Sequence, residues 1–141
     1  MGGLHIATAY ALESDTPLVF LHRQDGADMK DRIEGSVAPG QTVIVMDDLM
    51  TGGRSILSAA NRLEKAGMRV RDAIVLIDRE QGGTERLKEH GYNVRPILGL
   101  HTMLNYYHSS GLIDEAEFER CSDYLERFRK PRDTDMLNNG A

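Results

Sequence analysis

Short apolar runs alternate with helical patterns along most of this chain, and that alternation constrains its fold more than any other feature. Four runs have the length and composition of strands, at residues 18–21, 42–46, 73–77 and 92–98. The first two are almost continuously apolar, as expected of strands buried on both faces of a sheet. Apolar residues then recur at helical spacing over 56–66, and a short polar helix is expected over 83–90. Strands that alternate with helices predict an α/β fold, with a parallel sheet and helices on both of its faces.

Three more helices are predicted outside this alternating core, over residues 4–13, 101–110 and 114–129. The last two form a C-terminal pair, and Asp114 with Glu117 three residues later has the pattern of a capping box. Residues 131–141 contain Pro131 and an Asn-Asn-Gly run, which favour a flexible tail. A length of 141 residues falls in the range of one domain, so residues 1–130 are expected to form a single core.

The composition argues against several classes of function. A formal net charge of −5 and a pI near 5.5 argue against a nucleic-acid partner, because binding to a phosphate backbone usually needs a basic surface. No apolar run approaches the roughly 18 residues that a membrane-spanning helix needs, so no membrane association is expected. Cys121 is the only cysteine, which excludes an intramolecular disulfide and favours a cytoplasmic location.

Two adjacent carboxylates, Asp47 and Asp48, directly follow the apolar run 42–46. Adjacent carboxylates repel each other, and their apolar neighbours in the sequence offer no structural partner. In an open α/β sheet, ligands bind in the crevice beyond the carboxyl ends of the strands. Acids at that position can accept hydrogen bonds from neighbouring sugar hydroxyls or face a metal-bound ligand.

The run Thr51-Gly52-Gly53-Arg54-Ser55 then supplies two hydroxyls, unobstructed glycine N–H groups and the positive end of a helix expected to start near Ser55. These groups make an anion cradle. A Walker P-loop is excluded, because its lysine and its glycine spacing are absent. An ordinary strand-to-helix turn with Ser55 as the N-cap accounts for Ser55 but leaves the two acids unexplained. The stretch therefore predicts a phosphate site beside a polyol site.

Residues 43–55 resemble the phosphoribosyl pyrophosphate signature of type I phosphoribosyltransferases, which is an apolar strand, two acids, two apolar residues and Thr-x-Gly-x-Ser. The resemblance implies a Rossmann-like core. It also implies that the two acids contact the ribose 2' and 3' hydroxyls and that the following loop wraps the 5-phosphate. The implied set for ribose 5-phosphate is Asp47, Asp48, Leu49, Met50, Thr51, Gly52, Gly53, Arg54 and Ser55.

Other segments are similar to orotate phosphoribosyltransferases in particular. They are the glycine loop and helix start at 2–9, the Asp-Arg-Glu-Gln-Gly-Gly run at 78–83 and the helix pair within 104–125. The resemblance implies that Arg79 binds the orotate side, and a guanidinium fork suits a planar carboxylate or a pyrimidine carbonyl. The likeness covers nearly all of residues 2–129.

The chain also departs from that family in two places. The helical hood and the first core strand, which the family carries upstream of the glycine loop, are absent from this sequence. Loss of an interior strand predicts unpaired backbone groups and an apolar gap, unless another chain fills it. The loop before Ile33 is shorter than in the family and lacks a Lys-Asp-His-Gly run, so either it retains cations for pyrophosphate, at His22, Arg23 and Lys30, or it is only a solvated polar loop.

The resemblance implies Mg²⁺-dependent transfer of ribose 5-phosphate from phosphoribosyl pyrophosphate to orotate, forming orotidine 5'-monophosphate and pyrophosphate. Asp47, Asp48 and Lys30 are the implied catalytic residues, Mg²⁺ would arrive with the pyrophosphate, and a homodimer is expected. Two alternatives stay open: transfer to a purine or other base, and a non-catalytic binder of phosphoribosyl pyrophosphate or nucleotide. His90, His101 and His108 lack the spacing of metal ligands and are expected to be helix or cap residues.

Overall fold

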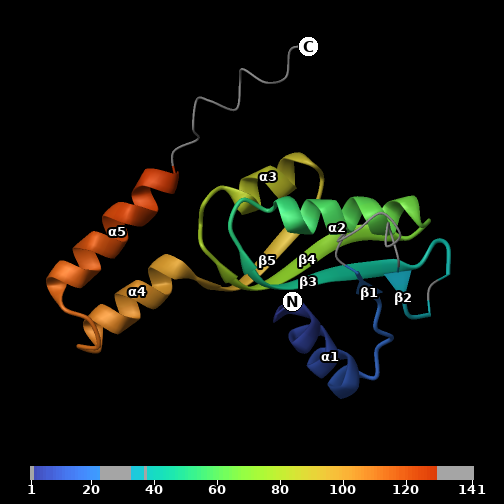
Figure 1. Cartoon of the computed structure of the whole chain (residues 1–141), viewed down its shortest axis with the longest axis horizontal. Coiled ribbons are helices and arrows are strands. Elements are labelled where there is room, and N and C mark those ends of the chain that lie inside the picture. The colour runs from blue at the N-terminus through green and yellow to red at the C-terminus, as the bar shows by residue number, and fades with distance from the viewer. Residues whose placement is uncertain (1, 23–32, 37, 130–141) are drawn as a thin grey trace, which may run out of the picture.

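A computed structural model describes residues 2–22, 33–36 and 38–129 of the chain (Figure 1). Its helices are α1 (Gly2–Ser14), α2 (Arg54–Lys65), α3 (Gly83–Glu89), α4 (Leu100–Ser109) and α5 (Glu115–Arg129). Its strands are β1 (Phe20–Leu21), β2 (Ile33–Glu34), β3 (Thr42–Met50), β4 (Arg69–Asp78) and β5 (Asn93–Gly99). All five predicted helices are present within a residue or two of their expected bounds. The predicted tail, residues 131–141, lies outside the described residues.

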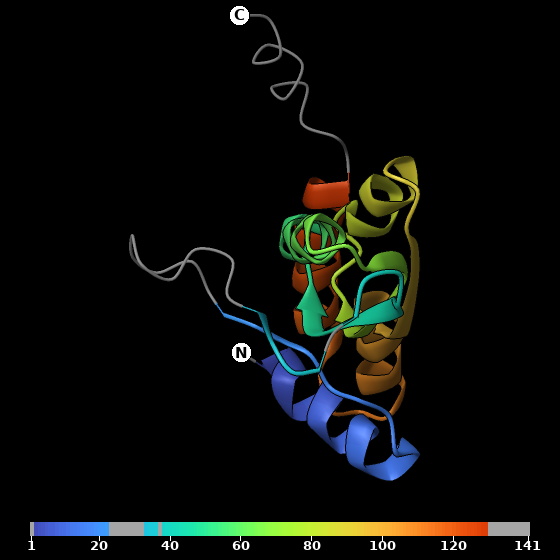
Figure 2. The same cartoon turned by 90° about the vertical axis from the view of Figure 1, so that its right-hand side faces the viewer.

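The centre of the fold is a parallel sheet in the order β3-β4-β5. Helices α2 and α3 lie on one side of this sheet and α1 lies on the other (Figures 1 and 2). The predicted α/β fold with helices on both faces is therefore confirmed. Parallel strands end at the same edge, and the pairing of Met50 with Asp78 brings the segments that follow β3 and β4 side by side.

The core lies between the sheet and the helices α2 and α3. Val75 at the middle of β4 and Leu87 on α3 are completely buried, and Ile56 and Ala60 of α2 are almost so. These apolar residues occur at the spacing that turns one helix face toward the sheet. This packing holds the amino ends of α2 and α3 close to the carboxyl ends of β3 and β4.

The prediction of a fully buried strand at residues 18–21 was wrong. Only Phe20 and Leu21 form a strand, which is half-buried and pairs antiparallel with β2, in a sheet separate from the parallel one. Val19 and Leu21 pack against the main core from this connection. The apolar run therefore reflects packing of a connecting segment, which composition alone does not distinguish from a central strand.

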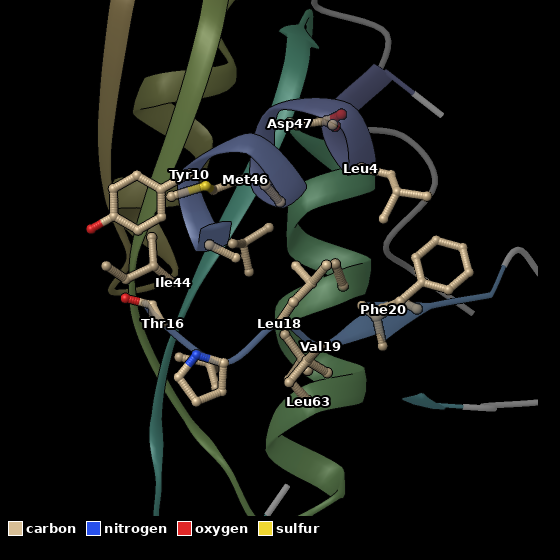
Figure 3. Close-up of a pocket in the computed structure, with 18 of the residues that line it drawn as sticks. Leu4, Tyr10, Thr16, Leu18, Val19, Phe20, Ile44, Met46, Asp47 and Leu63 are labelled. Atoms are coloured by element: carbon tan, nitrogen blue, oxygen red, sulfur yellow. The ribbon is translucent and has the colours of Figure 1, made fainter. Parts of the chain in front are cut away.

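The second apolar run is a strand, but it is also more exposed than expected. Within the described residues β3 pairs with β4 on one side only, and the side chain of Ile44 retains 48% of its exposure. Beside its free edge is a cavity of about 490 Å³ between α1 and α2 (Figure 3). Apolar side chains dominate its lining, among them Leu4, Leu18, Val19, Ile44, Met46 and Leu63. The expected apolar gap and unpaired strand edge are thus present.

The C-terminal helices α4 and α5 pack on each other beyond the end of the sheet (Figure 1). The capping box of α5 is confirmed: the Glu117 N–H donates to Asp114 Oδ1 at 2.7 Å, and the Asp114 N–H donates to Glu117 Oε2 at 3.1 Å. None of the helices in the described part of the chain is long and apolar enough to cross a membrane.

Truncation of Leu87 to alanine is expected to lower the free energy of unfolding by about 2–5 kcal/mol, because it opens a cavity beneath α3. Leu12→Ala is the matched control, since this α1 side chain is 81% exposed and loses the same atoms. Urea denaturation of both variants measures the difference. Equal free energies of unfolding would contradict the described packing of α3.

Candidate functional site

The two predicted acids lie near the carboxyl end of β3. This strand continues to Met50, beyond its expected end at residue 46. Asp47 is partly buried, and its Oδ1 accepts a hydrogen bond from the Asp48 N–H at 3.0 Å. Its Oδ2 lies 3.4 Å from the Ser55 hydroxyl, which is long for a hydrogen bond between oxygens. Asp47 and Ser55 are therefore neighbours in space, and most of the hydrogen-bonding capacity of the Asp47 carboxylate remains open.

The amino end of α1 packs directly on these acids. A Cβ on Gly3 would come within 2.7 Å of the Met46 carbonyl oxygen and 2.9 Å of the Asp47 Cα. A Cβ on Gly2 would overlap the Asp48 carboxylate. Only glycine permits this approach, which places two carboxylates at the positive end of a helix. The family resemblance at residues 2–9 includes Gly2 and Gly3, but the steric reason for these glycines appears only in the structure.

Burial raises the pKa of Asp47 above its ordinary value of 3.8, and the neighbouring Asp48 carboxyl raises it further. The Asp48 N–H and the Ser55 hydroxyl act in the opposite direction, because both donate to the charged form. The balance leaves the charged carboxylate short of partners. Such a group is suited to accept hydrogen bonds from a ligand.

The loop from Thr51 to Ser55 presents open N–H groups. In the described part of the chain, no protein acceptor receives the N–H groups of residues 52–55, and the first helical bond of α2 runs from Leu57 to the Gly53 carbonyl at 3.0 Å. Gly53 is the N-cap, in a left-handed conformation with φ of 73°, and no side chain caps the helix. The interpretation of this segment as an ordinary turn capped by Ser55 is therefore wrong. Free N–H groups at a helix start form an anion site.

Helix α3 packs against this loop through further close contacts. A Cβ on Gly53 would lie 3.0 Å from the Gly83 carbonyl oxygen, and a Cβ on Gly83 would lie 2.5 Å from the Thr51 carbonyl oxygen. The Arg86 side chain donates from Nη1 to the Gly52 carbonyl oxygen at 2.9 Å. The sequence analysis did not identify Arg86, because no spacing rule links it to a loop that ends 31 residues earlier.

Arg79, the predicted base-binding residue, follows β4 at the same edge of the sheet. Its N–H donates to the Met50 carbonyl oxygen at 2.9 Å, so its backbone is tied to the end of β3. The next residue, Glu80, has a left-handed φ of 55°, and its carboxylate accepts bonds from the N–H and the ring of His101 at the start of α4. The structure thus brings Arg79 to the edge that carries the two acids and the loop.

Known proteins similar to this chain agree on one family. No protein-family model matches the chain. The orotate phosphoribosyltransferase of Sulfolobus acidocaldarius is 32% identical over 124 residues, which cover 88% of this chain and 63% of that enzyme. The solved UMP synthase of Leishmania donovani aligns with a TM-score of 0.79 at 31% identity, over 88% of this chain and 27% of that chain. Over most of its length, the chain is thus similar to proteins of the type I phosphoribosyltransferase family.

A third similar structure is the orotate phosphoribosyltransferase of Mycobacterium tuberculosis, solved in complex with phosphoribosyl pyrophosphate. It aligns with a TM-score of 0.53 at 30% identity, over 60% of this chain and 48% of that one. The chain therefore spans between 27% and 63% of the length of these proteins.

The predicted pyrophosphate residues are only partly placed. Arg23 and Lys30 lie outside the described residues. His22 Nε2 lies 2.9 Å from Glu34 Oε1 in the β1–β2 pair, and its carbonyl oxygen accepts a bond from Arg62 at 2.8 Å. Among the residues that the structure describes, no group of three or more His, Cys, Asp or Glu is arranged to hold a metal ion.

The raised pKa of Asp47 predicts a pH-dependent effect of Asp47→Asn on stability. Folding favours the protonated carboxyl, so this contribution to stability is complete below the ordinary pKa of 3.8 and is lost as pH rises through the higher folded-state pKa. At neutral pH the charged carboxylate therefore destabilises the ligand-free protein. Asp47→Asn is expected to raise the melting temperature at pH 7, with the gain shrinking toward acid pH.

Thermal unfolding from about pH 4 to pH 8 measures this effect. Asp123→Asn, at an exposed position on α5, controls for the removal of one negative charge. A lower melting temperature for Asp47→Asn at pH 7 would contradict the account of a carboxylate short of partners.

Proposed function

We propose that this chain carries the phosphoribosyl site of an orotate phosphoribosyltransferase. The reaction transfers ribose 5-phosphate from phosphoribosyl pyrophosphate to orotate and forms orotidine 5'-monophosphate and pyrophosphate. The observation that carries the proposal is the pairing of an open N–H loop with two carboxylates at the end of β3. The similar proteins include orotate phosphoribosyltransferases, one of them solved with phosphoribosyl pyrophosphate, which supports the same donor and acceptor.

The donor's two polar ends suit the two halves of this site. The 5-phosphate needs hydrogen-bond donors, which the N–H groups from Gly52 to Ser55 and the positive end of α2 supply. The ribose 2' and 3' hydroxyls need acceptors, which Asp47 and Asp48 supply. The Asp47–Ser55 contact of 3.4 Å shows that the two halves adjoin.

On the acceptor side, Arg79 offers a planar fork of donors to the carboxylate or a ring carbonyl of orotate. The bond from its backbone N–H to the Met50 carbonyl oxygen holds the Arg79 backbone at the edge where the ribose is proposed to bind. The left-handed backbone of Glu80 and its bonds to His101 fix the turn that follows Arg79. Binding both substrates at one edge converts their encounter into a reaction within one complex.

The reaction breaks the bond between C1 of the ribose and the pyrophosphate oxygen, forms a bond from C1 to N1 of orotate, and releases the N1 proton of orotate to water or to the departing pyrophosphate. Negative charge builds on the departing pyrophosphate. Mg²⁺ bound to the pyrophosphate would supply the neutralising charge there, and the described residues fit this role, since two carboxylates without a third ligand suit a metal that arrives on its substrate. Lys30 and Arg23, which lie outside the described residues, are proposed to add positive charge to the pyrophosphate, and a cytoplasmic homodimer is proposed for the assembly.

A second candidate function is binding of phosphoribosyl pyrophosphate or nucleotide without transfer. The observation that favours it is the open cavity beside β3, which reaches Asp47 and Ser55 at one end (Figure 3). A site open on that side lets water compete with the reacting groups. A purine or another base as acceptor is a further alternative, because the donor site leaves the acceptor undetermined.

The proposal is tested by pyrophosphate release from phosphoribosyl pyrophosphate with Mg²⁺, with orotate, with a purine base, or with no acceptor. Release that depends on orotate is expected, and the double variant Asp47→Asn/Asp48→Asn should reduce it about a hundredfold or more. Asp123→Asn, which removes an exposed remote carboxylate, should leave the rate unchanged. Donor binding without release would support the non-catalytic alternative, and release with a purine alone would replace orotate as the acceptor.

A further inference from the structure

The phosphate-binding capacity of the loop depends on how one peptide unit is turned. Gly52 and Gly53 flank this unit, and glycine allows a wide range of backbone angles, so the unit can expose either its N–H or its carbonyl oxygen on a given side. The N–H attracts a phosphate, whereas the carbonyl oxygen repels it. An anion cradle therefore needs a contact that selects one orientation of this peptide unit.

Arg86 provides a contact that selects it. Its Nη1 donates to the Gly52 carbonyl oxygen at 2.9 Å, and the side chain is half-buried between α3 and the loop. A Cβ on Gly52 would lie 3.2 Å from the same nitrogen, so the guanidinium packs against the loop as well as bonding to it. A hydrogen bond from a charged donor is among the stronger ones in proteins.

The arginine itself is held in place by α3. Its own N–H donates to the Gly82 carbonyl oxygen at 3.1 Å in the first turn of that helix. The helix start is tied to β4, because the Thr84 hydroxyl donates at 2.9 Å to Asp78, a carboxylate that is 5% exposed. The guanidinium thus projects from a rigid element rather than from a surface loop.

The geometry of the peptide unit fixes the direction of the Gly53 N–H. In a planar trans peptide, the carbonyl and the N–H of one unit point in opposite directions. Because the Gly52 carbonyl points toward Arg86, the Gly53 N–H points away from it. This N–H donates to no protein acceptor in the described ranges, so it is available to a ligand.

We propose that Arg86 is a positioning residue for the donor phosphate. It locks the Gly52–Gly53 peptide with its N–H toward the 5-phosphate and keeps the carbonyl oxygen away from that anion, without touching the substrate. The inference rests on the proposed function, since the phosphate in question belongs to phosphoribosyl pyrophosphate. It adds to that function a residue on α3, outside the signature segment.

The test compares Arg86→Met with Lys88→Met by calorimetric titration of phosphoribosyl pyrophosphate with Mg²⁺. Both variants lose one positive charge from α3, and Lys88 is exposed. Arg86→Met should weaken donor binding roughly tenfold to a hundredfold, with the turnover rate at saturating donor preserved, while Lys88→Met matches the unmodified chain. Arg86→Lys, which keeps a charged donor, should recover part of the affinity.

Equal donor affinities for Arg86→Met and Lys88→Met would overturn the inference and leave the proposed function standing. Failure of the unmodified chain to bind the donor would overturn both. If Arg86→Met does not fold, the amide resonances of the unmodified chain decide. Saturating donor should shift the Gly53 amide proton downfield, and an unshifted Gly53 amide in a chain that binds the donor would refute the lock.

Discussion

The whole arrangement depends on the close approach of glycine backbones around the end of β3. Gly3 lies against Met46 and Asp47, Gly53 lies against Gly83, and Gly83 lies against the Thr51 carbonyl. The contacts of Gly3 and Gly83 are closer than a side chain would allow, and that of Gly53 would be tight for one, so the starts of α1, α2 and α3 converge on one edge of the sheet. That convergence places two carboxylates, an open loop and the positive ends of helices within one small volume.

The site keeps polar groups that the fold itself does not satisfy. The N–H groups of 52–55 have no protein acceptor in the described residues, and burial raises the pKa of Asp47. Burial of the charged Asp47 carboxylate costs stability, because a charged group removed from water needs a partner. A ligand with a phosphate at one end and hydroxyls at the other supplies those partners. The donors of the loop and the acceptors of the two carboxylates therefore indicate a ligand with complementary polar ends.

Local sequence patterns predicted the elements that local interactions determine. The helices, the capping box at Asp114 and the parallel strands followed from spacing, and the signature at 43–55 marked the candidate site, whose residue roles stay a prediction. The prediction of a buried strand at 18–21 was wrong, because these apolar side chains pack in a connecting segment and its backbone does not pair with the main sheet. Arg86 could not be found, because its role depends on α3 lying under the loop, which is a property of the tertiary structure.

The edge of β3 that is unpaired in the described residues bears on whether the chain can catalyse the transfer. The cavity beside this edge lies between α1 and α2 and reaches Asp47 (Figure 3). Any group that fills the cavity therefore borders the proposed ribose site. The proposed binding of ribose 5-phosphate uses only the loop and the carboxylates. Transfer also needs water to be excluded from the reacting atoms. Binding and transfer are therefore separable properties of this chain.

The central claim is that the end of β3 and the loop after it form one site for ribose 5-phosphate. A crystal structure of the chain with ribose 5-phosphate tests it most directly. The account predicts the phosphate on the N–H groups of residues 52–55 and the 2' and 3' hydroxyls on Asp47 and Asp48. A ligand bound elsewhere, or a phosphate held only by side chains with the loop amides unused, would contradict it.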